Sequence, residues 1–353
     1  MEEGKVKTKG LYIHFPFCKR FCFYCHFTKF KHDDFLEDKY INYLIKELNL
    51  RKGDYLIDTI YFGGGSPSII NKNLIEKLVN FIFKNFKISK GLEFTIEVNP
   101  EDSSSNLFEF YKNIGINRVS LGTQSFDDSD LKFLRRTHNL NDNIKALEML
   151  KSIGFSNINI DLIIALPFQD FKSIDNSIKY IKDFDINHVS SYILEEINLD
   201  IDEKFIEDIY FYTRKRLIDI GFNHYEVSNF SKKGYESKHN LKYWTGKEYI
   251  GAGVSSSGYE NGVDYKNHVD FDNYFKSLDS NNLPVLEKNE YSNDYRRIIT
   301  GLRLFNGIDK RYFNNYEDIL QKMIDNGFLL RENDLIRINP DYILILNEIL
   351  SNF

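Results

Sequence analysis

Apolar β-rich runs alternate with amphipathic helical patterns over the first two hundred residues, and this alternation leaves few folds open to the chain. The β-rich runs are Leu11–Phe17, Leu56–Phe62, Leu92–Val98, Arg118–Leu121, Ile158–Leu166 and Val189–Leu194. The helical patterns are Phe35–Leu50, Leu74–Phe86, Leu107–Ile114, Leu131–Leu134 extended by Asn143–Ile153, and Ile174–Phe184. Such βα units form a parallel sheet with right-handed crossovers. Six units predict an α/β fold, a partial (β/α)6 barrel over residues 1–200.

The pattern changes after residue 200. A helical pattern at Glu203–Ile220 leads into a mixed segment, Gly221–Tyr259, that is rich in Asn, Ser, Gly and Tyr. Further helices are predicted at Tyr291–Leu304, Tyr316–Asn326 and Asp341–Leu350, with a short hairpin around Leu329–Ile338. We therefore expect a post-barrel segment over 201–285 and a small winged-helix-like unit over 286–353.

Charge and hydropathy exclude several classes of protein. The formal net charge is −6, from 46 basic and 52 acidic residues, which argues against nucleic acid as a partner. No apolar run approaches the roughly 18–20 residues that span a bilayer. Residues 1–10 are charged and contain no apolar core of a signal peptide. We expect a cytoplasmic protein with no transmembrane segment, which leaves peripheral association with a membrane open.

The chain has only three cysteines, Cys18, Cys22 and Cys25, directly after the first predicted strand. An odd number within eight residues is incompatible with a disulfide framework. Three thiolates on one loop can hold three irons of a [4Fe–4S] cluster, and the fourth iron then needs a ligand other than cysteine. The alternative is a zinc site completed by His26. Adjacent ligands at Cys25 and His26 would make tetrahedral coordination awkward.

The residues around the cysteines resemble a known signature. Tyr-Ile-His-Phe-Pro-Phe-Cys at 12–18, continued through Cys25 and Phe27, resembles the radical S-adenosylmethionine (SAM) signature of the oxygen-independent coproporphyrinogen III oxidase family. The resemblance runs from Leu11 to about residue 350. Within this family the chain is most similar to the HemW-type heme chaperone branch, because the oxidases usually carry a fourth cysteine at the position of Phe27.

The resemblance implies a radical SAM barrel that holds a [4Fe–4S] cluster and SAM. In this superfamily the SAM amino and carboxylate groups bind the open iron, and one electron from the reduced cluster cleaves the sulfonium. The implied partners are a reducing protein such as flavodoxin or ferredoxin, heme or a porphyrin, and an apo-hemoprotein acceptor. The implied function is heme chaperone. One alternative is an oxidase that decarboxylates coproporphyrinogen III, against which Phe27 argues, and another is a zinc-stabilised binding domain.

Several separate motifs match positions that contact SAM in the family. The run Gly63-Gly64-Gly65-Ser66-Pro67 ends the second predicted strand, where glycine lets the backbone approach a ligand closely. Asp161 interrupts an otherwise apolar strand, as either a ligand contact or a structural hydrogen-bond hub. The resemblance assigns the following residues to SAM: Tyr12, Tyr24, Gly64, Gly65, Ser66, Glu97, Gln124, Arg136 and Asp161.

A second motif lies beyond the predicted barrel. His239-Asn-Leu-Lys-Tyr-Trp244, or HNxxYW, resembles the heme-binding motif of the chaperone branch, and histidine is a common heme ligand. The resemblance implies that His239 binds heme. The alternative is a histidine that packs a helix against the barrel. Because the segment follows the last predicted strand, we expect it to fold over the C-terminal ends of the strands, near the cluster.

Overall fold

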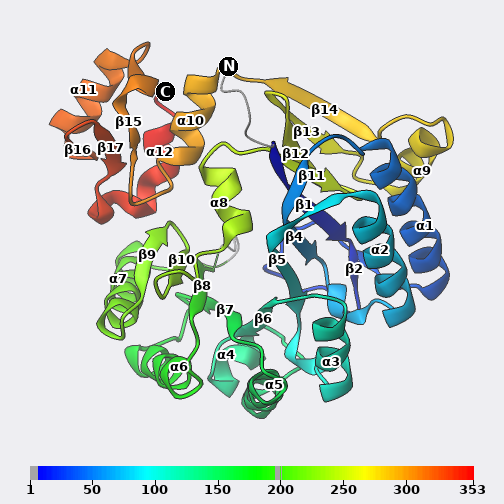
Figure 1. Cartoon of the computed structure of the whole chain (residues 1–353). Helices are drawn as coiled ribbons and strands as arrows, with labels where there is room; N and C mark the ends of the chain where they lie inside the picture. The colour runs from blue at the N-terminus through cyan, green and yellow to red at the C-terminus, as the bar shows by residue number, and fades with distance from the viewer. Residues whose placement is uncertain (1–6, 195–198, 200) are drawn as a thin grey trace.

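Six parallel strands form the centre of the structure, a computed structural model that describes residues 7–194, 199 and 201–353 (Figure 1). They lie side by side in sequence order, and each pair is parallel. They are β1 (Thr8–Phe15), β4 (Leu56–Gly64), β5 (Lys87–Val98), β6 (Arg118–Gln124), β7 (Asn157–Ile164) and β8 (His188–Ile193). The predicted partial (β/α)6 barrel is confirmed. Residues 1–6, on which part of the signal-peptide argument rests, lie outside the described residues.

Helices cover the outer face of these strands (Figure 1). They are α1 (Asp34–Leu50), α2 (Lys72–Asn85), α3 (Ser105–Asn113), α4 (Asp128–Phe133), α5 (Leu140–Ile153) and α6 (Phe171–Asp183). Alternate residues of a strand point to opposite faces. On β5, Phe94 and Ile96 are fully buried in the apolar core, whereas Thr95 and Glu97 point to the other face. The barrel interior is therefore lined by polar side chains.

Shorter strands extend the sheet to twelve strands, which the sequence did not predict. Beyond β1 lie β11 (Tyr249–Ala252), which is parallel to it, and then β12 (Ser257–Glu260), β13 (Val263–Asn267) and β14 (Val285–Glu290), which are antiparallel. Beyond β8 lie β10 (Asn229–Ser231) and β9 (Asn223–Glu226). The predicted domain boundaries stay a prediction, and β14 belongs to the main sheet.

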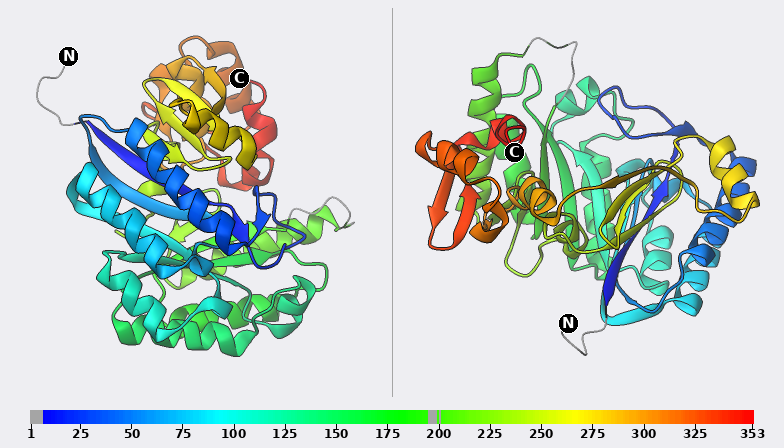
Figure 2. Two further views of the ribbon diagram at one scale, coloured as in Figure 1. Left: turned by 90° about the vertical axis from the view of Figure 1, so that its right-hand side faces the viewer. Right: turned by 90° about the horizontal axis from the view of Figure 1, so that it is seen from above.

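The C-terminal unit begins at α10 (Asn293–Gly301) and contains the predicted hairpin, β16 (Leu329–Glu332) with β17 (Leu335–Ile338). It also contains β15 (Ile308–Asp309), α11 (Glu317–Asp325), the 3-10 helix η4 (Pro340–Ile345) and α12 (Leu346–Leu350). Figure 2 shows this unit, orange to red, on the side of the molecule opposite α1 and α2. Among the described helices, none is both long and apolar enough to cross a bilayer.

The helix that carries the HNxxYW motif, α8 (Lys238–Trp244), closes the N-terminal end of the barrel. Thr59 Oγ1 on β4 lies 2.8 Å from His239 Nδ1, and the carboxylate of Glu93 on β5 accepts a hydrogen bond from the backbone N–H of His239 at 3.0 Å. Both partners lie in the first halves or middles of their strands. The expectation that this segment covers the C-terminal ends is wrong, because the His239 side chain and the backbone N–H groups at the start of α8 bind polar side chains in the N-terminal and middle parts of the strands.

A buried carboxylate joins α1 to the strands beyond β1. Glu47 is fully buried and accepts hydrogen bonds from Arg51 Nε (2.8 Å) and Tyr274 OH (2.7 Å). It also accepts from the backbone N–H of Gly253 and from Asn267 Nδ2, both at 2.8 Å. Because Gly253 follows β11, this carboxylate ties the added strands to the βα core.

We expect Glu47→Ala to lower the free energy of unfolding by about 3–5 kcal/mol, because it removes the acceptor of several buried donors and one of the two carboxylates that pair with the buried Arg51 guanidinium, the other being Glu260. Urea unfolding of the two proteins measures the difference. The control is Glu287→Ala, at an exposed position on β14, which should change the free energy by no more than about 0.5 kcal/mol. Equal stability of both variants would contradict this role for Glu47.

Candidate functional site

A cavity of about 1160 Å³ extends from the C-terminal ends of the strands into the barrel. Its mouth is formed by the cysteine loop and by the loop after β4, and its walls by inward-facing residues of β5, β6, β7 and β8. Asn240 of α8 also lines it, so α8 is part of the floor. The cavity exceeds the roughly 300–1,000 Å³ of an ordinary small-molecule site.

The three cysteines lie at the mouth of this cavity. Cys18 ends β2 (Phe17–Cys18), which pairs with β3 (Phe30–Lys31), and the intervening loop carries Cys22 and Cys25. Burial is the main cause that raises the pKa of the Cys18 thiol to about 11, with a smaller contribution from the neighbouring Cys25 and Cys22. A cationic iron centre would reverse this effect by stabilising the thiolates.

The spacing of the thiols fits a cluster better than one zinc ion. Two sulfurs bound to one zinc at about 2.3 Å lie less than about 4.6 Å apart. Over the described residues, the single set of three possible metal-ligand atoms within 4.8 Å of one another is His32, Asp34 and Glu37, outside this loop. The three cysteine sulfurs therefore do not all lie within 4.8 Å of one another, as three ligands of one zinc ion would.

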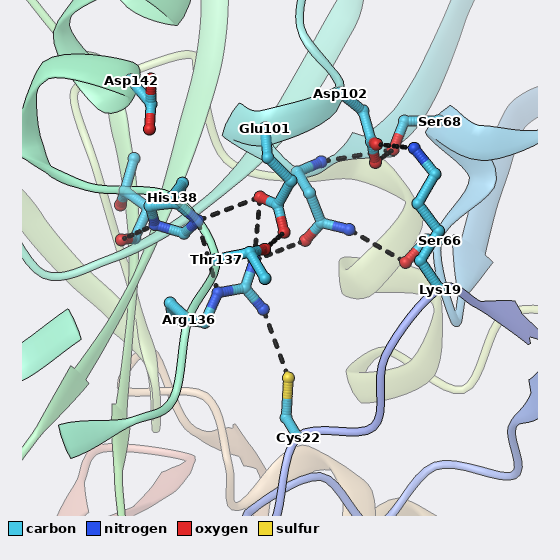
Figure 3. Close-up of polar contacts among 12 residues, drawn as sticks. Lys19, Cys22, Ser66, Ser68, Glu101, Asp102, Arg136, Thr137, His138 and Asp142 are labelled. Atoms are coloured by element: carbon cyan, nitrogen blue, oxygen red, sulfur yellow. Dashed lines mark hydrogen bonds and ion pairs between the residues drawn. The ribbon is translucent and has the colours of Figure 1, made fainter. Parts of the chain in front are cut away.

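Arg136 connects the cysteine loop to the barrel (Figure 3). Its Nη1 lies 3.4 Å from Cys22 Sγ, and its Nη2 donates to Asn99 Oδ1 at 2.8 Å. Glu101 Oε2 lies 3.5 Å from Nη2. Although burial acts to raise it, the His138 hydrogen bond and the charge of Arg136 lower the pKa of Glu101 to about 2, so Glu101 is ionised and holds the guanidinium in place.

Asn99 is a site residue that sequence reasoning missed. Its Nδ2 donates to Ser66 Oγ at 2.9 Å while its Oδ1 accepts from Arg136, so it links the glycine-rich loop to the cysteine loop. Glu101 and His138 were missed as well. Their position in the sequence could have indicated them. Asn99 and Glu101 follow Glu97 at spacings of two residues, directly after a predicted strand of the parallel sheet.

The glycine-rich loop packs against the cysteine loop with no room for side chains. A Cβ on Gly65 would lie 2.5 Å from the Phe17 carbonyl oxygen and 3.0 Å from Cys18 Sγ. Gly65 and Ser66 line the cavity. Gly64 lies behind them, has a φ of +115°, and donates its backbone N–H to Glu97 Oε2 at 3.0 Å. Substitution at Gly65 would separate the two loops, whereas a Cβ on Gly64 would lie 2.5 Å from the His14 ring on β1.

Two half-buried carboxyl groups line the cavity below the loops. Glu97 accepts hydrogen bonds from Tyr61 OH at 2.9 Å and from Gly64, and burial together with the charge of Asp161 raises its pKa to about 7. Asp161 accepts from Asn159 Nδ2 at 2.8 Å, and burial raises its pKa as well. Asp161 is thus both a hydrogen-bond hub and a cavity residue. Two acidic groups in one buried cavity favour a cationic ligand.

The other predicted residues divide into two groups. Tyr24 and Gln124 line the cavity, and the Tyr24 hydroxyl is buried. Tyr12 and His239 lie outside the lining. Tyr12 OH is 2.9 Å from His14 Nδ1, and the Tyr12 ring centroid is 6.4 Å from that of His239.

His239 is fully buried beneath the cavity. Burial lowers its pKa to about 3, so the imidazole is neutral at physiological pH. Its Nε2 has no hydrogen-bond partner among the described residues. The rings of Tyr12, Tyr61 and Tyr243 surround it. One nitrogen is therefore chemically able to bind a metal, but only after α8 or the imidazole has moved.

Residues 12–181 match the Radical SAM superfamily. The chain is 33% identical to Heme chaperone HemW of Lactococcus lactis over 98% of this chain and 97% of that protein. It is 30% identical to Heme chaperone HemW of Bacillus subtilis, over 98% and 99%. Coproporphyrinogen III oxidase (HemN) from Escherichia coli has the same fold, with a TM-score of 0.86 at 20% identity over 99% of this chain and 90% of that one.

The radical SAM family implies a [4Fe–4S] cluster and SAM, and the site fits both. Three separated thiols lie beside a cavity that contains two acidic groups and a close-packed glycine loop. Identity of 33% over nearly the whole of both chains is decisive for the narrower family. The chain is a radical SAM protein and belongs to the HemW family.

Proposed function

We propose that this protein is a heme chaperone, which binds a [4Fe–4S] cluster and SAM and delivers heme to apo-hemoproteins. The observation that carries the proposal is one continuous cavity with the three cysteines at its mouth and the HNxxYW helix at its floor. The relatives named Heme chaperone HemW support it over nearly the full length of the chain.

In this proposal Cys18, Cys22 and Cys25 would hold the cluster, and SAM would bind beside it in the cavity. When bound, the two cofactors supply one-electron chemistry at the sulfonium. Arg136 donates to the Cys22 sulfur and stabilises negative charge there. SAM is enclosed by the predicted residues that line the cavity, and the carboxyl groups lie toward its positive charge. These residues are Tyr24, Gly65, Ser66, Glu97, Gln124, Arg136 and Asp161. Tyr12 and Gly64 lie outside the cavity lining and act through other residues. The Tyr12 hydroxyl contacts His14, and the Gly64 backbone N–H donates to Glu97.

His239 is the proposed heme ligand. Its imidazole is neutral, its Nε2 is without a partner in the described chain, and aromatic rings that can stack on a porphyrin surround it. Because it is fully buried, heme reaches it only when α8 shifts from its place below the cavity. Heme uptake should therefore include a conformational step.

The proposed protein partners are an apo-hemoprotein acceptor and an electron donor such as flavodoxin or ferredoxin. Lys19 and Arg20 are exposed beside the cluster cysteines and line the mouth of the cavity, where Lys19 pairs with Asp102 at 2.7 Å. Their positive charge suits an acidic electron carrier, although the chain as a whole has a net charge of −6. The cytoplasmic location stays a prediction.

The affinity for SAM should fall as the pH is lowered through 7. The pKa of Glu97 is about 7, set by burial and by Asp161, with Tyr61, Gly64 and Arg118 acting in the opposite direction. A cationic ligand prefers the ionised carboxylate, which forms about a tenth of the population at pH 6 and nine-tenths at pH 8. Calorimetry on anaerobic, cluster-loaded protein should show roughly tenfold weaker binding at pH 6. Glu97→Gln should bind SAM weakly and remove most of this dependence; a variant with the wild-type profile would contradict the role of Glu97.

Heme titration tests the chaperone function and its proposed ligand together. The wild type should bind heme with a defined Soret band, and His239→Ala should shift that band and weaken binding. The control is His224→Ala, which removes a mostly buried histidine stacked on Phe230, away from the HNxxYW helix, and should leave the band unchanged. An unchanged Soret band in His239→Ala would show that His239 does not bind the heme iron. Efficient anaerobic conversion of coproporphyrinogen III would move the protein to the oxidase function.

A further inference from the structure

The inner part of the cavity contains positive charge that the SAM site does not use. We define the inner lobe by Arg118 on β6, Tyr210 on α7 (Glu203–Asp219), Asn240 on α8, Arg303 after α10, and Leu344 on η4, all of which line the cavity. It lies between the barrel interior and the C-terminal unit. The lobe combines two guanidinium groups with an aromatic and an aliphatic wall.

Arg118 is the largest fully buried side chain of the barrel, at 1% exposure. Its Nε has no hydrogen-bond partner, and no carboxylate oxygen lies within 4.0 Å of its guanidinium anywhere in the described chain. In the register of β5 and β6, Arg118 lies opposite Thr95. Ser120, two residues further along β6, lies opposite Glu97. A buried guanidinium without a paired anion is costly, so this side chain is suited to an anionic ligand that enters the cavity.

The nearby carboxyl groups do not neutralise Arg118 directly. Its charge acts to lower the pKa values of Glu97 and Asp161, yet burial keeps both above their ordinary values. Glu97 instead accepts its hydrogen bonds from Tyr61 and Gly64, and Asp161 accepts from Asn159. The two acidic groups thus line the same cavity as Arg118 without forming an ion pair with it.

Arg303 brings a second guanidinium to the lobe from the other side. Its Nη2 donates to Asn347 Oδ1 at 2.9 Å, and its central carbon lies 5.5 Å from the Trp244 ring centroid. No ion pair to a carboxylate is found for it in the described residues. Asn347 and Trp244 therefore orient the group without neutralising it. Since Trp244 ends the HNxxYW motif, Arg303 also connects the lobe to α8.

We propose that the inner lobe binds the propionate carboxylates of heme, one at Arg118 and one at Arg303. This inference rests on the proposed function and adds the groups that recognise the ligand. Arginine binds carboxylates through two parallel hydrogen bonds, which suits a ligand with two carboxylates on a flat apolar body. Tyr210 and Leu344 contact that body. SAM, a cation at its sulfonium, occupies the acidic part of the cavity nearer the cysteines.

The test compares heme with heme dimethyl ester, which has the same ring and iron but no free carboxylates. Both are titrated into the full-length wild type, Arg118→Gln, Arg303→Gln and the control Arg337→Gln, whose side chain pairs with Glu332 on the surface. We expect each lobe variant to bind heme about 10–100-fold more weakly, and Arg337→Gln to bind as the wild type does. The ester should bind the wild type and both lobe variants with similar, weak affinity. Arg118→Lys should recover part of the heme affinity.

The outcomes separate this inference from the proposed function. Equal affinity for heme and its ester in the wild type, or lobe variants that lose both ligands equally, would overturn the inference while leaving heme binding intact. A wild type that binds neither would overturn the proposed function and the inference with it. If Arg118→Gln does not fold, the ester comparison on wild type and Arg303→Gln decides the matter.

Discussion

The two faces of the parallel strands carry different kinds of side chain, and the rest of the structure depends on this difference. Phe62, Phe94 and Ile96 face the helices and are fully buried, each adding about 1.5–3 kcal/mol of burial energy. The alternate residues, among them Glu97 and Arg118, face the interior. Outer apolar packing therefore holds the strands together and leaves the inner face free to form a polar cavity.

Charge changes along this cavity in a definite order. Thiols lie at the mouth, carboxyl groups below them, and guanidinium groups at the inner lobe. Arg136 at the mouth is held by Glu101 and Asn99, so it fixes the cysteine loop. Arg118 has no such partner among the described residues. A cation held by a carboxylate and an amide oxygen fixes the position of its neighbours, whereas an unpaired one in a cavity is available to a ligand. The same residue type thus has a structural role at one end and a proposed recognition role at the other.

Local sequence was enough to predict the parts of the site that rest on one loop or one strand. Three cysteines within eight residues predicted the thiol loop, and Asp161 was noticed because it interrupts an apolar strand. The position of His239 was predicted wrongly, because chain order does not tell which end of a barrel a later helix closes. Asn99 and Arg118 were missed for a related reason. The role of each depends on contacts with other parts of the barrel, which are present for Asn99 and absent for the Nε of Arg118 among the described residues.

The proposed function requires that the three cysteines hold a cluster whose fourth iron has no cysteine ligand and is open to the SAM cavity. Electron paramagnetic resonance of the anaerobically reduced protein, recorded with and without SAM, can detect such an iron. A cluster with three thiolate ligands should give a reduced [4Fe–4S] signal whose g-values change when SAM is added, because SAM then binds the fourth iron. A spectrum that SAM leaves unchanged, or a colourless protein that contains zinc and no iron, would contradict the account.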